Sequence, residues 1–247
     1  DSSVIATPMY HVTGMICILS VMLAVGGTVY LMKKVDADRI LTCFLENNIT
    51  FYHASPTVFT ILLEKRSSYP LIPSVKSFAC GSGNMAPENI RKLKEWMPQA
   101  EFHTVYGMTE TSGAGTIFPG GAADSPWIGA SGIPMPDLQI KIADDDGTEL
   151  MENQIGEICL KGSFVVEEYY KQKADSITED GWLRTGDLGY YNQAGYLYIV
   201  DRKKDMINRG GEKVCSFDIE NTIHTLPGVV EAVVVGVPDS KYMEVPA

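Results

Sequence analysis

The sequence lacks any closely spaced pair of cysteines. Its cysteines are odd in number and far apart, at Cys17, Cys43, Cys80, Cys159 and Cys215. This spacing argues against a disulfide framework and against a zinc site. We therefore expect reduced thiols and a cytoplasmic protein.

The sequence also lacks a long run of basic residues, and its formal net charge is -11. Nucleic-acid binding depends on lysine and arginine side chains that neutralise phosphates. We therefore expect a small-molecule ligand and no nucleic-acid partner. Composition leaves the oligomeric state open, including a homo-oligomer.

Charged residues are missing between residues 4 and 32. The run is long enough for a membrane helix, which needs about 20 apolar residues. Gly26-Gly27 interrupts it, however, and residues 28–32 have the composition of a strand. We expect a buried helix followed by a buried strand, with no transmembrane segment and no signal peptide.

Strand-like and helix-like segments alternate between residues 28 and 105. Strands are predicted at 28–32, 49–53, 75–80 and 102–105, with helices at 40–45, 56–63 and 90–97. Such alternation favours an α/β fold, in which a parallel sheet carries helices on both faces. Ligands of such sheets bind in loops beyond the carboxyl ends of the strands.

The pattern changes after residue 112. Short strands, such as 155–160 and 196–200, are separated by Asp/Gly turns and indicate a β-rich subdomain over residues 113–202. Residues 203–247 contain a charged turn, a helical pattern and a predicted strand at 229–235. We interpret them as the start of a small α+β C-terminal domain, and residues 1–112 as part of a large N-terminal α/β domain.

The strongest local motif is Tyr106-Gly107-Met108-Thr109-Glu110, which directly follows a predicted strand. A tyrosine can stack on a purine, a threonine hydroxyl can donate to a phosphate oxygen, and a glutamate supplies the hard oxygen that Mg²⁺ prefers. The motif suits a metal-bound nucleotide. The alternative is a strand-to-loop turn with Tyr106 in the core and Glu110 in solvent.

Gly81-Ser82-Gly83 follows the predicted strand 75–80. Small residues at such a position let the backbone approach a planar ligand closely. The alternative is a simple turn before a helix that begins at Pro87.

Two further motifs are Gly181-Trp182-Leu183-Arg184-Thr185-Gly186-Asp187 and Asp201-Arg202-Lys203-Lys204-Asp205-Met206-Ile207-Asn208-Arg209-Gly210-Gly211-Glu212-Lys213. With the tyrosine motif, and in this order, they resemble the adenylate-forming superfamily of acyl-CoA synthetases, nonribosomal adenylation domains and luciferases. The resemblance extends from residues 8–14, which include His11, to Gly236-Val237-Pro238-Asp239. It implies truncation at both ends, with a phosphate loop expected before Asp1 and a late lysine expected after Ala247.

The resemblance implies roles in binding ATP and Mg²⁺. Tyr106 would stack on adenine, with the backbone of Gly81, Ser82 and Gly83 on its other side. Thr109 would contact the α-phosphate, and Glu110 would bind the metal.

The resemblance assigns further roles outside these two loops. Asp187 would accept hydrogen bonds from the ribose hydroxyls, and Arg202 would reach ribose or phosphate. His11 would line the acyl and phosphate side of the pocket, unless it is a packed core residue. Lys204 would be a hinge, and the loop with Gly210 and Gly211 would leave room for the pantetheine arm of CoA.

The segment from Lys204 to Glu212 resembles acyl-CoA ligases more than peptide-synthetase adenylation domains. We expect an ATP-dependent ligase that converts a carboxylic acid, fatty or otherwise hydrophobic, to an acyl-adenylate and then to an acyl-CoA thioester. The alternatives are an aryl-acid CoA ligase, a carrier-protein adenylation domain, or a non-catalytic nucleotide-binding fragment. Because of the implied truncation, these 247 residues alone are expected to show little pyrophosphate exchange.

Overall fold

The computed structural model describes residues 1–172, 175–226, 228–229 and 232–247. The chain forms two compact units, Asp1–Met135 and Pro136–Ala247. The finer division into 1–112, 113–202 and 203–247 stays a prediction. All five cysteines are free thiols.

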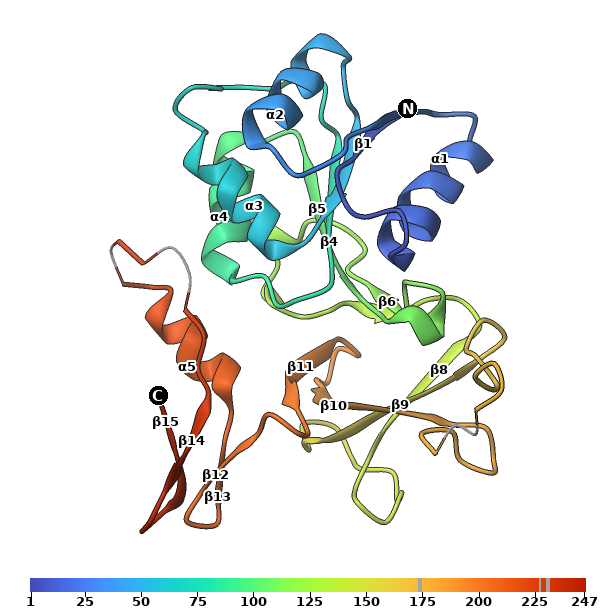
Figure 1. Cartoon of the computed structure of the whole chain (residues 1–247), viewed down its shortest axis with the longest axis vertical. Helices are drawn as coiled ribbons and strands as arrows, with labels where there is room; N and C mark the ends of the chain where they lie inside the picture. Colours follow the sequence, from blue (N-terminus) through green and yellow to red (C-terminus); the bar gives the residue numbers. More distant parts are fainter. Residues whose placement is uncertain (173–174, 227, 230–231) are drawn as a thin grey trace. The chain divides into compact units, whose positions relative to one another are not determined.

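The first unit is built on a seven-stranded sheet with the order β2-β1-β3-β4-β5-β6-β7 (Figure 1). Its strands are β1 Ser2–Ile5, β2 Thr28–Leu31, β3 Phe51–Ala54, β4 Ser77–Cys80, β5 Glu101–Tyr106, β6 Thr116–Ile117 and β7 Ile133–Pro134. Strands β1 to β5 run parallel, while β6 and β7 are antiparallel. The expected α/β sheet is confirmed, although β1, β6 and β7 were not predicted.

Helices cover both faces of this sheet, as predicted. Figure 1 shows α2 Ala37–Glu46, α3 Pro56–Glu64 and α4 Pro87–Trp96 on one side, and the π-helix η1 Thr13–Ser20 with α1 Val21–Ala24 on the other. The residues at the N-termini of α2, α3 and α4 favour the start of a helix. The Asp36 carboxylate accepts a hydrogen bond from the Arg39 amide at the beginning of α2 (3.1 Å), and Pro56 and Pro87 occupy the first turns of α3 and α4.

Aromatic rings fill the space between the helices and the sheet. Phe44 of α2, Tyr52 of β3 and Phe59 of α3 are buried and meet edge to face, with ring centroids 5.0 and 5.9 Å apart. Such pairs add to the stabilisation from burial alone. This packing holds β3 and β4 in place beneath the loops that follow them.

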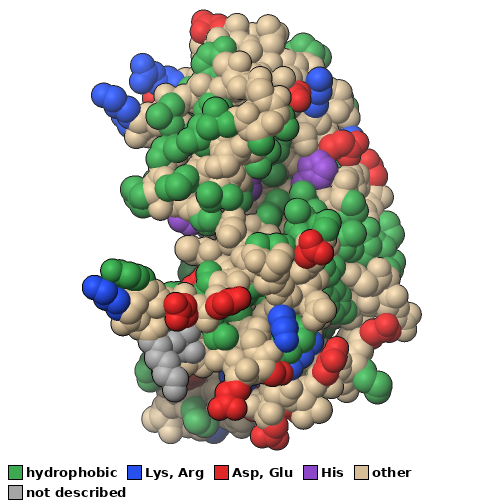
Figure 2. Space-filling view, turned by 90° about the vertical axis from the view of Figure 1, so that its right-hand side faces the viewer, with side chains coloured by type: hydrophobic (Ala, Val, Ile, Leu, Met, Phe, Trp, Pro, Cys, Tyr) green, Lys and Arg blue, Asp and Glu red, His purple; other side chains and the backbone are tan. Residues whose placement is uncertain are grey.

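The predicted burial of the N-terminal helix is confirmed for Ile18 and Met22 but not for the rest of the helix, and the predicted burial of the following strand was wrong. Leu23, Val25 and Leu31 are 66%, 62% and 65% exposed. These side chains are exposed because β2 lies at the edge of the sheet and because η1 buries little more than one of its sides. Figure 2 shows hydrophobic side chains gathered on this face. No helix among the described residues is long and apolar enough to cross a membrane.

The second unit contains two antiparallel sheets. The first has the order β11-β10-β9-β8 and consists of β8 Leu138–Ala143, β9 Gly156–Gly162, β10 Leu183–Tyr191 and β11 Leu197–Arg202. The second has the order β13-β12-β15-β14 and consists of β12 Ile207–Arg209, β13 Glu212–Val214, β14 Gly236–Asp239 and β15 Met243–Pro246. Short 3-10 helices elsewhere in the chain are η2 Thr109–Thr111 and η3 Ala122–Asp124.

The helical pattern expected within residues 203–247 forms α5 Ser216–Ile223. The strand predicted at 229–235 is placed differently. Residues 230 and 231 lie outside the described residues, 232–235 are irregular, and the strand β14 begins at Gly236. The described residues of this apolar run therefore precede a strand rather than form one.

Helix α5 is attached to β11 by a buried carboxylate. Asp201 is 1% exposed, and its Oδ2 accepts hydrogen bonds from the Ser216 amide (2.7 Å) and the Ser216 hydroxyl (3.0 Å). Its Oδ1 accepts from the Arg202 amide (2.7 Å). One side chain thus satisfies donors on both sides of the segment that joins β11 to α5.

Replacing Asp201 with alanine is expected to lower the free energy of unfolding by about 2–3 kcal/mol, because buried donors lose their acceptor. Ser216→Ala keeps the amide bond and should cost only about 1 kcal/mol. Urea denaturation followed by circular dichroism measures both. Equal effects of the two substitutions would contradict this account.

Candidate functional site

The loop 81–83 and the tyrosine motif lie at the same edge of the first sheet. Strands β4 and β5 are parallel neighbours in which Cys80 pairs with Thr104. Gly81 therefore lies beside Val105, and a side chain at Gly81 would approach the Val105 carbonyl oxygen to 3.0 Å. Ser82 adopts a φ of 65°, and Ser82 and Gly83 are exposed. The structure thus brings two predicted ligand loops to one edge.

The segment that starts at Tyr106 closes into a tight loop. The Gly115 amide donates to the Tyr106 carbonyl (2.7 Å), and the Gly113 amide donates to the Met108 carbonyl (3.0 Å). A Cβ atom at Gly107 would overlap the Gly113 carbonyl oxygen, so only glycine fits there.

The centre of this loop is held by a buried threonine. The Thr111 hydroxyl accepts from the Met108 amide (3.0 Å) and donates to the Met108 carbonyl (3.1 Å). These bonds frame η2, in which Thr109 is exposed and Glu110 is partly exposed. Tyr106 is also only partly buried, which contradicts the alternative of a core tyrosine. The loop therefore presents polar groups at the sheet edge.

The segment with His11 lies against the same loop. A Cβ atom at Gly113 would collide with the Cys17 sulfur and lie 3.5 Å from the Val12 side chain. His11 itself is exposed, and its Nδ1 accepts a hydrogen bond from the Thr13 amide (3.2 Å). The alternative of a packed core histidine is therefore wrong.

A second histidine, which the sequence analysis did not select, lies beneath the loop 81–83. His53 of β3 is 5% exposed, and its Nε2 would be 3.4 Å from a side chain at Gly81. Burial lowers the pKa of His53 from 6.5 to about 4. The ring is therefore neutral at physiological pH and contributes shape rather than charge.

In the second unit, Asp187 lies on a bulge of β10. Arg184 pairs with Cys159 and Leu188 with Glu157, so residues 185–187 face the single residue Ile158. Gly186 has a φ of 75°, which glycine adopts at little cost. Bulges re-aim side chains and occur often beside active sites.

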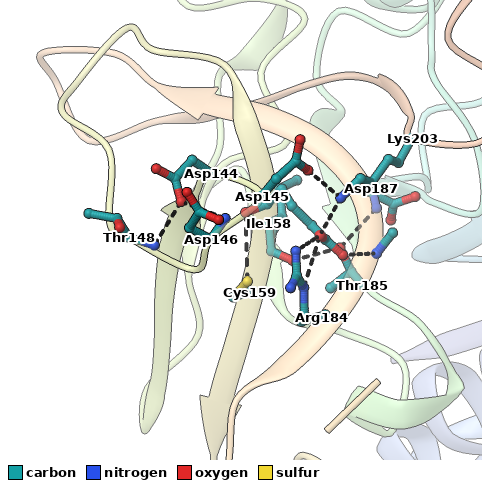
Figure 3. Close-up of polar contacts among 12 residues, drawn as sticks. Asp144, Asp145, Asp146, Thr148, Ile158, Cys159, Arg184, Thr185, Asp187 and Lys203 are labelled. Carbon is teal, nitrogen blue, oxygen red and sulfur yellow. Dashed lines mark hydrogen bonds and ion pairs between the residues drawn. The ribbon is translucent and has the colours of Figure 1, made fainter. Parts of the chain in front are cut away.

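Polar contacts fix this bulge. The Thr185 hydroxyl donates to the Ile158 carbonyl (2.8 Å) and accepts from the Asp187 amide (3.0 Å). The Gly186 amide donates to Glu157 Oε1 (3.1 Å). Figure 3 shows Thr185, Asp187 and Arg184 close together on β10, with Lys203 beside them.

Asp187 and Arg202 are direct partners across β10 and β11. Arg202 Nε lies 3.7 Å from Asp187 Oδ1. The Asp187 side chain is 16% exposed and that of Arg202 is 61% exposed. The carboxylate is sheltered while the guanidinium reaches solvent, so the pair can offer an acceptor and a donor to one ligand.

Lys204, Gly210 and Gly211 are exposed. Arg209 pairs with Glu212, so the two glycines form the turn of the β12–β13 hairpin, with φ values of 63° and 98°. Two-residue hairpin turns of this kind require positive φ. The hairpin itself thus explains both glycines, which sequence reasoning had linked to CoA.

The predicted site residues divide between the two units. The first holds His11, the loop 81–83 and Tyr106 to Glu110, and the second holds Asp187, Arg202, Lys204 and the hairpin glycines. In the described ranges, no three His, Cys, Asp or Glu side chains gather to hold a metal. Glu157 was missed, although an acidic residue inside the apolar segment 155–160 is a signal that could have revealed it.

Comparison with known proteins identifies the family. The AMP-binding enzyme family matches residues 1–170. The chain belongs to this AMP-binding enzyme family. The 2-succinylbenzoate–CoA ligase of Enterococcus faecalis is 33% identical over 250 residues, which cover 100% of this chain and 50% of the relative.

Solved structures agree with this membership in the AMP-binding enzyme family. The o-succinylbenzoate CoA synthetase MenE of Bacillus subtilis, in complex with the acyl-adenylate intermediate OSB-AMP, matches with a TM-score of 0.87 and 30% identity. The ATP-bound MatB of Rhodopseudomonas palustris also matches with a TM-score of 0.87, at 31% identity. Both matches cover 100% of this chain, and 50% and 49% of the respective relatives. The chain thus spans about half the length of its relatives.

The buried His53 predicts a pH dependence of stability. Its pKa is lower in the folded state than the ordinary 6.5, so the unfolded chain binds the proton more readily. Stability is therefore lost as pH falls from about 6.5 towards 4, by about 3 kcal/mol in total. Urea denaturation at several pH values should show that His53→Gln lacks this part of the slope. His224→Gln, a change outside the sheet, is the matched control and should retain it.

Proposed function

We propose that this chain is part of an ATP-dependent acid–CoA ligase. The enzyme would form an acyl-adenylate and then a CoA thioester. The observation that carries the proposal is the tyrosine motif at the carboxyl edge of the parallel sheet, directly beside the loop 81–83. Its relatives include proteins named as CoA ligases, and the similar CoA synthetase MenE of Bacillus subtilis has been solved with an acyl-adenylate.

In the first step, a carboxylate oxygen of the acid attacks the α-phosphorus of ATP, and the bond to pyrophosphate breaks. In the second, the CoA sulfur attacks the acyl carbon, and AMP leaves with the bonding electrons. Phosphoryl-group chemistry of this kind needs positioning and charge stabilisation more than a protein nucleophile. The exposed hydroxyl of Thr109 suits donation to the α-phosphate, and the ring of Tyr106 suits stacking on adenine.

Glu110 fits a magnesium ion that is shared with the nucleotide. Mg²⁺ is usually held by one or two carboxylates together with substrate phosphates and water. One partly exposed glutamate in the loop therefore suffices, and a protein cage of three ligands is not required. The bound ion would neutralise developing charge on the phosphates. The MenE enzyme of Bacillus subtilis has been solved with ATP and a magnesium ion.

CoA is the proposed thiol acceptor. The same Bacillus subtilis enzyme, as a double mutant, has been solved with the product analogue OSB-NCoA. In this chain the hairpin turn at Gly210 and Gly211 presents no side chain, which leaves room for a pantetheine arm. A carrier-protein acceptor is the competing proposal.

The acid is proposed more broadly than the sequence suggested. The sequence motifs favoured a fatty or other hydrophobic acid. Relatives are named for 2-succinylbenzoate, an aromatic acid, and for oxalate, a dicarboxylic acid. We therefore propose a carboxylic acid from the aliphatic, aryl or dicarboxylic class.

The proposal predicts AMP release that depends on both the acid and CoA. The parent protein would be assayed for AMP and thioester with ATP, Mg²⁺, CoA and acids of the three classes. Thioester and AMP in equal amounts with one class would support the ligase and identify the acid. AMP without thioester would favour another acceptor, and no AMP with any acid would overturn the ligase proposal.

Gly107→Ala is expected to weaken ATP binding at least about tenfold, because the added methyl group displaces the loop that carries Thr109 and Glu110. Gly195→Ala is the matched control. It also introduces a side chain, at a φ of 77°, but meets nothing within 4 Å. Isothermal titration with ATP and Mg²⁺ measures both variants. Similar affinities for the two would remove the loop from the nucleotide site.

A further inference from the structure

Glu157 is a charged residue in the interior of an apolar strand. It lies on β9 between Gly156 and the buried residues Ile158 and Cys159, and it is 6% exposed. Burying a carboxylate costs several kcal/mol unless it is paired and hydrogen-bonded. Glu157 therefore needs hydrogen-bond and ion-pair partners, and all of its partners described below lie in or next to the bulge of β10.

Both carboxylate oxygens of Glu157 are occupied. Oε1 accepts from the Gly186 amide (3.1 Å). Oε2 accepts from Arg184, whose Nε and Nη2 lie 3.0 and 2.6 Å away, and from Lys203 Nζ (3.2 Å). Burial raises the pKa of Glu157, but the bonds to Arg184 and Lys203 outweigh it and hold that pKa below 4.5. The group is an anion at physiological pH.

The partners of Glu157 enclose the bulge that carries Asp187. Arg184 precedes the bulge and Gly186 lies within it. Lys203 closes its other side, because the Lys203 amide donates to the Gly186 carbonyl (2.8 Å). The peptide groups on both sides of Gly186 are thus held by hydrogen bonds. These bonds fix the direction in which the Asp187 side chain points from the backbone.

We infer that Glu157 is a positioning residue for the Asp187 carboxylate. It makes the bulge of residues 185–187 rigid, so that little conformational entropy is lost when Asp187 binds the ribose hydroxyls of the nucleotide. The inference rests on the proposed function, and on the hydrogen bonds from the ribose hydroxyls to Asp187 that the family resemblance implies. Glu157 acts through the backbone of Gly186 and touches no substrate.

A carboxylate is the side chain that suits this position. Its two oxygens both accept, and so they serve the Gly186 amide and the two cations together. A glutamine has one acceptor and one donor group. Whichever way the amide is turned, its NH₂ group faces either the Gly186 amide or the Arg184 and Lys203 cations.

The test compares the binding of ATP and of 2′,3′-dideoxyATP, each with Mg²⁺, by isothermal titration of the full chain. The wild type is expected to prefer ATP by about tenfold or more, since a hydrogen bond to a charged group is lost in the analogue. Glu157→Gln should reduce this preference to about threefold or less. A purely structural role would lower the melting temperature and leave the preference unchanged.

Asp145→Asn is the matched control. Asp145 also binds Lys203 Nζ (2.7 Å), but its side chain is 80% exposed and none of its described contacts reaches the bulge. It should retain the wild-type preference. Arg184→Lys is the milder second variant, since a lysine replaces two donor nitrogens with one group. It should lose part of the preference even if Glu157→Gln fails to fold.

Asp187→Asn separates this inference from the proposed function. If Asp187→Asn leaves the ATP preference intact, or if the wild type binds no ATP, the proposed nucleotide site is wrong. If Asp187→Asn abolishes the preference while Glu157→Gln and Arg184→Lys both retain it, the site stands and the role of Glu157 is overturned. On the Asp187→Asn background, Glu157→Gln should have no further effect.

Discussion

The parallel register of β3, β4 and β5 is the constraint on which the first half of the site depends. Parallel strands end at a common edge, and the loops that follow them meet there. With Cys80 level with Thr104, Gly81 must pass beside Val105, and Tyr106 must emerge next to the loop 81–83. The apolar packing of Phe44, Tyr52 and Phe59 maintains that register. The ligand loops are therefore positioned by a core whose residues are not among the proposed ligand contacts.

The second unit uses a different device, because its antiparallel strands have no common carboxyl edge. Polar residues reach their positions through irregularities in the ladder, and buried carboxylates stabilise those irregularities. Glu157 holds the bulge of residues 185–187, and Asp201 holds the start of α5. Each carboxylate accepts backbone amide bonds that the regular ladder cannot satisfy. In this unit, buried carboxylates thus position the proposed site residues, whereas apolar packing positions them in the first unit.

The sequence predicted the parallel strands β2 to β5 and the helices between them, since each has one apolar pattern of its own period, but it missed the parallel strand β1. The alternation of 49–53, 56–63 and 75–80 needs no distant partner to be recognised. The prediction failed at the described residues of 229–235 and at the exposed face of η1 and α1, where the outcome depends on which neighbour covers an apolar side chain. Motif order identified Tyr106, Thr109, Glu110 and Asp187 as candidates, because a motif is read from neighbouring residues and needs no knowledge of the fold.

The roles of Glu157 and Asp201 could not be predicted from sequence motifs, because these roles depend on contacts between segments that are distant in the sequence. Asp201 and Ser216 are 15 residues apart, and Glu157 and Arg184 are 27 apart. A single acidic residue in a strand indicates that a partner exists but does not identify it. The register shift between Arg184 and Leu188, which makes Glu157 a neighbour of Gly186, is visible only in three dimensions.

These contacts also bear on the proposed hinge at Lys204. Lys203 is fixed to β10 by its amide and to Glu157 by its ammonium group, so the backbone before residue 204 belongs to the first sheet of this unit. Beyond Lys204, the Asp205 and Met206 amides bond back to the Arg202 carbonyl, each at 3.0 Å. A rotation at Lys204 would break these two bonds and separate Asp201 from Ser216, while the bulge that carries Asp187 would remain intact. A hinge at Lys204, as the family resemblance implies, would therefore leave the proposed ribose contact undisturbed.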